Sequence, residues 1–439
     1  MSSHYALPAA MLLFGSLCSV GQTTLRDQQI SRELKSNKVI FIDGKPTDSI
    51  AAANADSVRE AVATFYYDQF RHFQDPGAPY FLFLSKDAQL AMGIGGCVRM
   101  RAYYDWDGAI PSPGFAPYLI PMTPDPGNMK NFGTSPAGTC LFFRVLGSNK
   151  TLGKHQLYIE ANFNGYERRD FRLKKAYAII NDFTVGYAPS TFSDPAAQPP
   201  TVDAQGPNNK ISPTRVLLRY MPVIKKRWYL AVSAETPEAS VNVDNVAIGK
   251  VSNKMPDFAA FAQYEWARGQ HVRVAGIYRT LGYRDLTAGR NHFLSGWGLQ
   301  LSTVANPMPQ LTFYGSVNYG KGYAGLGGDL LIGGYDLVGD PDRPGKMYAP
   351  ASLGWCAGVS YNILPELFMS VTASQTRYLP KHDVDGEEYK YGLLGAVNIF
   401  WNMTPRIQVG AEFDIGKRQN FNRRHSTAQR VGAMCQFSF

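Results

Sequence analysis

The residues of this 439-residue chain best suited to chemistry are arginines and lysines that recur at every second position of short segments. Side chains alternate between the two faces of a strand, so this spacing places the cations on one face. In the segment 88–106, Arg99 and Arg101 share one face, whereas Met100 and Tyr104 share the other. A row of fixed cations beside an apolar face predicts a surface that attracts anions.

Catalytic patterns are missing from the sequence. It has no Gly-x-Ser-x-Gly motif, and its histidines show no spacing to a nucleophile. His271 falls on the charged face of an alternating segment, where lining a lumen is a better explanation than catalysis. We therefore expect no enzymatic activity.

We also expect no metal and no cofactor. Asp340-Pro341-Asp342 and the segment 383–388 are acidic but lack the glycine spacing of an EF-hand. The glycine-rich segment 325–328 has no following helix to make a phosphate cradle. The scattered cysteines, which have no metal-ligand spacing and predict no disulfide framework, are Cys97, Cys140, Cys356 and Cys435.

The composition favours many strands over helices. The chain holds 42 Gly, 25 Tyr and 25 Phe, and it lacks an apolar run long enough for a membrane-spanning helix. Alternation recurs about sixteen times, which predicts an all-β fold, a transmembrane antiparallel up-and-down β-barrel in the bacterial outer membrane. The predicted strands are 88–106, 139–147, 155–163, 171–180, 183–188, 215–220, 227–234, 258–266, 271–279, 297–305, 311–319, 353–362, 367–375, 389–401, 407–416 and 429–439.

The connections between these segments alternate in length. Short links such as 181–182, 306–310 and 402–405 carry Asn or Pro suited to tight turns. The intervening links, including 107–138 and 417–428, are longer and more polar. Short periplasmic turns, long external loops and two periplasmic termini are expected of such a barrel.

Three regions are expected along the chain. Residues 1–21 resemble a signal peptide, with an apolar stretch followed by Ser19-Val20-Gly21. Residues 22–87 form a predicted periplasmic segment containing a helix that begins near Ser57, where Ser57 and Glu60 have capping-box spacing. Residues 88–439 form the barrel.

The cost of placing charged residues in lipid indicates which face of each strand points outward and which points into the lumen. A Lys or Arg at the bilayer midplane costs roughly 2–4 kcal/mol, so charged residues belong in the lumen. The predicted anion-selecting residues are Arg99, Arg101, Arg144, Arg172, Lys174, Arg215, Arg219, Arg273 and Arg279. The inward acidic residues are fewer: Asp105, Glu160, Glu235, Glu265, Glu412 and Asp414. Lys175 is the exception, because it falls on the apolar side of its strand, toward the outer rim.

The middle of the chain carries motifs that resemble the DcaP-like porin family. They are Phe171-Arg172-Leu173-Lys174-Lys175-Ala176-Tyr177, then Gly186-Tyr187-Ala188-Pro189-Ser190-Thr191-Phe192-Ser193-Asp194, then Asp203-Ala204-Gln205-Gly206-Pro207. The chain departs from the family pattern at Tyr187, where the family has Gln, and at Ala204, where it has Phe. The resemblance implies a homotrimeric outer-membrane channel for small organic anions.

The loop 189–212 joins the fifth and sixth predicted strands. By analogy with general porins it is expected to fold inward and narrow the pore. Its Asp194, Asp203 and Asn208 would then face a basic wall across the constriction. The alternative is that these side chains only pin the loop.

The chain ends on an alternating segment whose last residue is Phe439. Such an ending resembles the strand recognised by the barrel-assembly machinery. The formal charge of +9 could indicate nucleic acid, but the expected export and the absence of a basic run or binding motif argue against it. A secreted soluble β-protein and a plugged or structural barrel remain the alternatives.

Overall fold

The computed structural model describes most of the chain after residue 90. The described residues are 38–41, 81–85 and 90–439, apart from 107, 109, 111, 124, 164–169, 226, 242–246, 268 and 405. The expected signal peptide and the helix expected near Ser57 lie outside the described residues.

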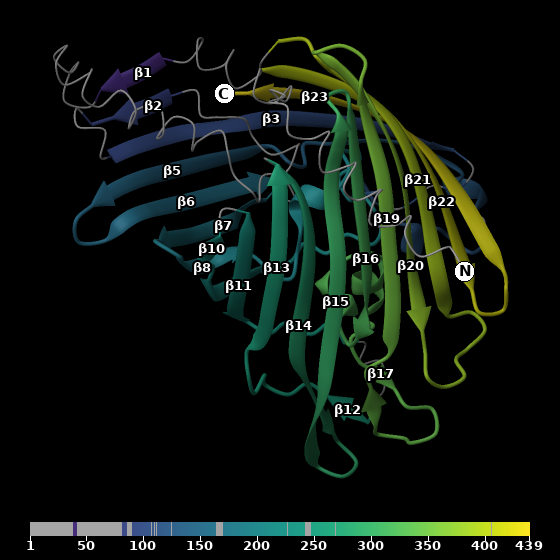
Figure 1. The fold of residues 1–439 in the computed structure, drawn as a ribbon. Helices are drawn as coiled ribbons and strands as arrows, with labels where there is room; N and C mark the ends of the chain where they lie inside the picture. Colours follow the sequence, from purple (N-terminus) through teal and green to yellow (C-terminus); the bar gives the residue numbers. More distant parts are fainter. Residues whose placement is uncertain are drawn as a thin grey trace, which may run out of the picture.

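The described chain forms a closed antiparallel barrel of 16 strands (Figure 1). Closure comes from the last strand pairing with the first, from Gln429 opposite Trp106 to Ser438 opposite Cys97. The two backbone hydrogen bonds between Phe439 and Gly96 continue this ladder. A sheet closed in this way has no open edge among its membrane-spanning strands, which confirms the predicted barrel.

The barrel strands are β3 (Leu90–Trp106), β5 (Cys140–Asn149), β6 (Gly153–Phe163), β7 (Phe171–Ile180), β8 (Phe183–Pro189), β9 (Thr214–Tyr220), β11 (Trp228–Glu235), β13 (Asp257–Ala267), β14 (Gln270–Asp285), β15 (Arg290–Met308), β16 (Leu311–Lys321), β19 (Ala351–Asn362), β20 (Leu367–Leu379), β21 (Tyr389–Asn402), β22 (Ile407–Asn420) and β23 (His425–Ser438).

The described chain also contains short strands and helices in addition to the barrel strands. They are β1 (Lys38–Phe41), β2 (Phe81–Leu84), η1 (Pro117–Leu119), η2 (Pro126–Asn128), β4 (Lys130–Ser135), η3 (Pro195–Ala197), β10 (Val223–Lys225), β12 (Ile248–Gly249), η4 (Ala324–Leu326), α5 (Asp329–Gly333), β17 (Val338–Gly339) and β18 (Met347–Tyr348). None of the helices in the described part of the chain is long and apolar enough to cross a membrane.

Alternating side chains divide each strand as expected. On β14, Arg273 and Arg279 are buried on the inner side, whereas Val274 and Tyr278 are exposed on the outer side. The same division places the exposed apolar residues in a band around the outside of the barrel. Strand parity therefore assigned the faces correctly at these positions.

Two external connections are shorter than predicted because the strands themselves are longer. β22 and β23 pair as far as Gln419 opposite His425, so only 421–424 link them where a loop from 417 to 428 was predicted. β14 and β15 likewise extend to Asp285 opposite Arg290. We call the end of the barrel with the short turns the turn end, and the opposite end the loop end.

The outer band supplies a test of the membrane-facing surface. Val274→Arg is expected to destabilise the protein folded into lipid vesicles by about 2–4 kcal/mol, because the side chain of Val274 is exposed on the apolar outer face of β14. Folding is followed by urea titration of the vesicle-inserted protein.

The matched control is Thr287→Arg, which adds the same side chain to the exposed turn between β14 and β15. Little change is expected there. Equal losses for the two variants would contradict the assignment of the outer band.

Candidate functional site

The chain between β8 and β9, residues 190–213, lies inside the barrel. Ser190, Thr191, Phe192 and Ser193 are fully buried at its start. Phe192 packs with Ile277 of β14 in an apolar cluster on the inner wall. We call residues 190–213 the inner loop. Its inward path agrees with the prediction made from strand order.

Asp194 anchors the first part of the inner loop to β14 and β15. Its carboxylate accepts hydrogen bonds from the ring Nε2 of His271 at 2.8 Å and the hydroxyl of Ser302 at 2.6 Å. The guanidinium of Arg273 lies 3.7 Å away. Burial alone would raise the pKa of Asp194, but Arg273 and these hydrogen bonds outweigh it and hold the pKa below its usual range. Asp194 therefore pins the loop as an anion.

The middle of the inner loop is held by β20, β21 and β22. The carbonyl of Pro200 accepts hydrogen bonds from Ser370 and Asn398, each at 2.9 Å. The backbone N–H groups of Val202 and Asp203 donate to the carboxylate of Glu412 at 2.8 and 2.5 Å. These contacts carry the loop across the lumen to the wall opposite β8.

Asn208 anchors the returning part of the loop. Its amide donates to Asp329 of α5 at 3.1 Å and to the carbonyl of Gly392 at 2.9 Å. Asn208 and Asp194 thus contact walls away from the predicted basic wall, which favours the loop-pinning interpretation for both.

Asp203 is the predicted loop residue that lies on the same side of the lumen as Arg99 and Arg101. Its carboxylate lies 3.5 Å from the guanidinium of Arg430 and accepts hydrogen bonds from the N–H of Phe115. Arg430 in turn donates to both carboxylate oxygens of Asp105, at 2.5 and 2.9 Å.

A cavity of about 280 Å³ lies between the inner loop and the wall made by β3, β5, β6 and β7. We call it the basic cavity. One carboxylate, that of Asp203, is among its lining residues. Its cationic lining residues are Arg99, Arg101, Lys174, Lys175 and Lys210.

The two arginines of β3 are held in fixed positions. Arg99 donates from Nε to the side chain of Gln436 at 2.7 Å. Arg101 donates from Nε to the carbonyl of Val202 at 2.6 Å and from Nη1 to the carbonyl of Ala137. Arg101 therefore joins the inner loop to the barrel wall while its charge borders the basic cavity.

A β-bulge brings both lysines of β7 to the same carboxylate. The β6–β7 register shifts between Glu160 and Ala161, leaving Lys174 as the extra residue. Lys174 then lies 2.8 Å and Lys175 3.2 Å from the two oxygens of Glu160, which is fully buried. The expectation that Lys175 points to the apolar side is wrong, because the bulge interrupts the alternation on which it depended.

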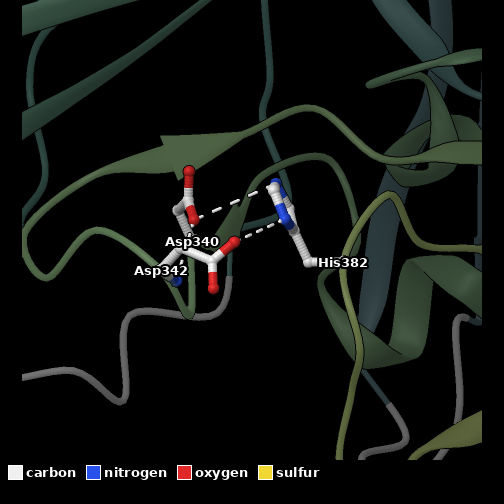
Figure 2. A group of neighbouring side chains, drawn as sticks. All are labelled: Asp340, Asp342 and His382. Carbon is white, nitrogen blue, oxygen red and sulfur yellow. Dashed lines mark hydrogen bonds and ion pairs between the residues drawn. The ribbon is translucent and has the colours of Figure 1, made fainter.

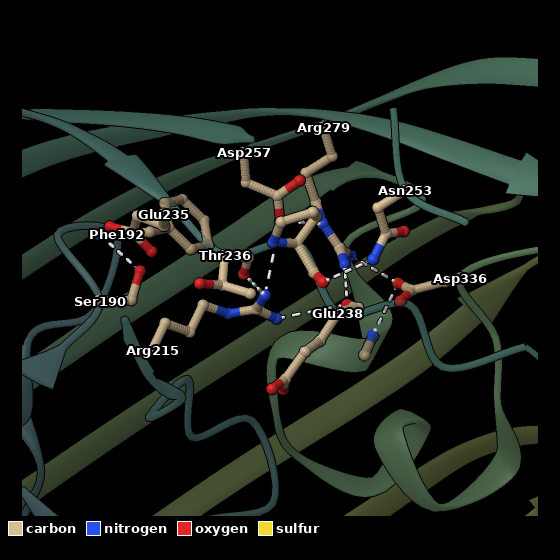
Figure 3. A network of polar contacts seen from close by, with 12 residues as sticks. Ser190, Phe192, Arg215, Glu235, Thr236, Glu238, Asn253, Asp257, Arg279 and Asp336 are labelled. Atoms are coloured by element: carbon tan, nitrogen blue, oxygen red, sulfur yellow. Dashed lines mark hydrogen bonds and ion pairs between the residues drawn. The ribbon is translucent and has the colours of Figure 1, made fainter. Parts of the chain in front are cut away.

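Arg215 and Arg279 belong to one network of polar contacts (Figure 3), and both are buried. Arg279 donates to Asp257 at 3.0 Å and to Asp336 at 2.9 Å. Arg215 donates to the carbonyl of Thr236 at 2.5 Å and approaches Asp257 to 3.6 Å. Both guanidinium groups are enclosed by these partners, so they hold the loops in place and do not border the basic cavity.

The remaining predicted anion-selecting residues are dispersed. Arg219 and Arg273 are buried beneath the inner loop and donate to the carbonyls of Pro189 and Ser193. Arg144 donates to Gln156 of the neighbouring strand. Arg172 lies at the loop end with a half-exposed side chain paired to Asp170. Arg99, Arg101 and Lys174 are the predicted residues that line the basic cavity.

Sequence reasoning missed Lys210 and the polar residues Gln198 and Thr201, which also line the basic cavity. All three lie in the inner loop, where no strand period assigns a face. The position of this loop between the fifth and sixth predicted strands was the available signal, because the analogy with general porins placed it inside the pore.

A second cluster lies outside the barrel wall. Asp340 and Asp342 face His382 from a neighbouring loop (Figure 2), and their ligand atoms lie within 4.8 Å of one another. The two ring nitrogens face different carboxylates, Nδ1 toward Asp342 at 3.0 Å and Nε2 toward Asp340 at 3.9 Å. This arrangement differs from that of a chelate, because one metal ion would bind only one ring nitrogen.

No protein-family model and no curated protein sequence matches the chain. The outer membrane channel DcaP of Acinetobacter baumannii is similar in structure, with a TM-score of 0.68 and 19% identity over 80% of this chain and 98% of that chain. An anion-selective porin from Comamonas acidovorans aligns with a TM-score of 0.51 and 9% identity over 80% and 100% of the two chains. The trimer form of OmpT of Vibrio cholerae aligns with a TM-score of 0.50 and 8% sequence identity, over 80% of this chain and 99% of that chain.

The chain has the fold of outer-membrane porins. This confirms the predicted transmembrane barrel of about 16 strands. The similarity in fold to DcaP also agrees with the resemblance noted in the motifs from Phe171 to Pro207.

Removing the charge of Asp194 tests the first anchor. Asp194→Asn is expected to destabilise the barrel by about 3 kcal/mol, because the buried Arg273 would lose the anionic partner that lies 3.7 Å away. Thermal unfolding in detergent and limited proteolysis of the inner loop report the effect. Asp182→Asn, in an exposed turn, is the control. Unchanged stability and unchanged protease resistance of Asp194→Asn would show that Asp194 is not an anchor.

The contact between Asn208 of the inner loop and Asp329 of α5 can be tested by changing the pH. Burial raises the pKa of Asp329 to about 7, although hydrogen bonds from Tyr389 and Asn208 oppose the rise. The folded chain therefore binds this proton more tightly than the unfolded chain. The stability that it contributes is complete in acid and is lost as the pH rises through about 7.

The expected loss is roughly 2–3 kcal/mol between pH 5 and pH 8, because the unfolded carboxyl is already ionised in this range while the folded one still holds its proton below about pH 7. Asp329→Asn should reduce this dependence of the unfolding temperature on pH, whereas Asp383→Asn in an exposed loop should not. An unaltered pH slope in Asp329→Asn would rule out this carboxyl as its source.

Proposed function

We propose that the chain is an outer-membrane porin through which small hydrophilic anions, organic acids among them, diffuse passively. The observation that carries the proposal is the basic cavity, where five cationic side chains meet one loop carboxylate. No reaction is catalysed, and no cofactor or metal is needed for this role. The porin fold of the chain supports a channel of this type.

The proposed mechanism is electrostatic. Cations fixed beside a narrow, low-dielectric passage raise the local concentration of anions and repel other cations. The side chains of Arg99 and Arg101 are already held by Gln436 and Val202, so little reorganisation is needed when a solute arrives. Several moderate contacts, in place of one strong site, allow an anion to leave as well as to enter.

The location and assembly of the chain are part of the same proposal. The exposed apolar band is suited to contact with outer-membrane lipid. One porin of the same fold is described in a trimer form, which supports a homotrimer for this chain. Recognition of the last strand by the barrel-assembly machinery, through Phe439, is proposed from the sequence ending. No nucleic acid partner is proposed.

The reversal potential under a KCl gradient in a planar bilayer tests the proposal. The wild-type protein is expected to conduct in steps and to prefer chloride. Arg99→Gln combined with Lys174→Gln should reduce the chloride-to-potassium permeability ratio several-fold, because both residues line the basic cavity. The preference should also weaken in high salt, since screening lengths fall from about 10 Å at 0.1 M to about 3 Å at 1 M.

The charge-matched control is Arg172→Gln combined with Arg284→Gln. It removes two positive charges from residues that do not line the basic cavity. The permeability ratio should stay close to that of the wild type. Cation preference of the wild type would refute the role of the basic cavity, and correctly folded protein without conductance would favour a plugged barrel.

A further inference from the structure

Two cysteines face each other across neighbouring strands beside the basic cavity. Cys97 of β3 and Cys140, the first residue of β5, are partners in the antiparallel ladder. Their sulfur atoms lie 3.5 Å apart, although 43 positions separate the residues in sequence. Both side chains are buried, and the Cys97 thiol also donates to the carbonyl of Gly138 at 3.4 Å.

The strand geometry is compatible with a covalent bond between them. Opposed residues of antiparallel strands have Cα atoms about 4.5–5.5 Å apart, within the range of about 4.4–6.8 Å that disulfides span. The two sulfur atoms need to approach by about 1.5 Å to reach the bond length of about 2.05 Å. Because the thiols already point at each other, small side-chain rotations can provide most of this movement.

One thiol of the pair borders the basic cavity. Cys140 lines the basic cavity together with Arg99 and Lys174. The attacking species in thiol–disulfide exchange is a thiolate. A small water-soluble oxidant that enters the basic cavity would therefore meet Cys140 first and its partner directly behind it.

We propose that Cys97 and Cys140 form a reversible disulfide that crosslinks β3 to β5 at the edge of the basic cavity. One thiolate attacks a disulfide-containing oxidant, and the second displaces it from the mixed disulfide. The two thiols lose two protons and two electrons as the S–S bond forms, and the oxidant is reduced to two thiols. The periplasm, which an outer-membrane chain crosses, is an oxidising compartment.

The crosslink would act on the basic wall through the turn 136–139. The Thr139 hydroxyl accepts a hydrogen bond from the backbone N–H of Arg99 at 2.9 Å, and the carbonyl of Ala137 accepts one from Arg101. Cys140 directly follows this turn. Oxidation would tie the turn to β3 and restrict the positions of both arginines, and reduction would release it. The crosslink itself does not depend on the proposed transport function.

Mass spectrometry of the full-length chain tests the proposal. Detergent-folded protein and protein refolded from urea are equilibrated with glutathione and glutathione disulfide, and free thiols are alkylated before proteolysis. The expected product is a peptide pair joined through Cys97 and Cys140, which dithiothreitol separates. The unfolding temperature of the oxidised wild type should exceed that of the reduced protein by about 5 °C, because the crosslink closes a long loop.

The other cysteines provide matched controls. Cys356→Ser and Cys435→Ser should keep the linked peptide pair, and Cys97→Ser should abolish it. Linkage of Cys97 to Cys140 in either the folded or the refolded sample supports the proposal. Separate alkylation of both residues in both samples across the redox series, or preferential linkage to Cys435, would overturn it. The comparison of oxidised and reduced wild type remains decisive even where Cys97→Ser does not fold.

Discussion

Hydrocarbon provides neither hydrogen-bond partners nor hydration for charged groups, and the rest of this structure depends on that constraint. The backbone satisfies it by closing the sheet, with β23 pairing to β3 and Phe439 extending the ladder to Gly96. The side chains satisfy it by alternation, so that Arg273 and Arg279 point inward while Val274 and Tyr278 contact the outside. The charged side chains of such strands therefore lie mostly inside the barrel.

The inward loops compensate much of that charge. Arg273 approaches Asp194, Arg279 pairs with Asp336, and Arg430 approaches Asp203, and all three carboxylates come from loops. Buried guanidinium groups without such partners would be costly, so inward folding of the loops also stabilises the wall. At β3, β5, β6 and β7, five cationic residues line a cavity with a single loop carboxylate, and two of them, Lys174 and Lys175, share the wall carboxylate of Glu160. Cationic side chains are therefore concentrated on one side of the interior.

Irregularities of the sheet shape the same region. The bulge opposite Glu160 directs Lys174 and Lys175 to one carboxylate, and the turn 136–139 separates β4 from β5 beside β3. The turn supplies the carbonyl that binds Arg101, and it places Cys140 opposite Cys97. Bulges commonly redirect side chains next to functional sites. The basic cavity thus lies where the regular alternation of the barrel is interrupted.

The sequence by itself determined the barrel, the number and order of its strands, and the inward direction of residues such as Arg99 and Arg279, because these depend on a period of two that is local to each strand. Only the tertiary structure decided which inward cations border the cavity. Arg215 and Arg279 obey the same period as Arg99, yet loops distant in sequence enclose them. The bulge at Lys174 and the pairing of Cys97 with Cys140 could not be predicted from the sequence, for a related reason. The register between two strands depends on hydrogen bonds between segments, and not on the spacing of residues within one segment.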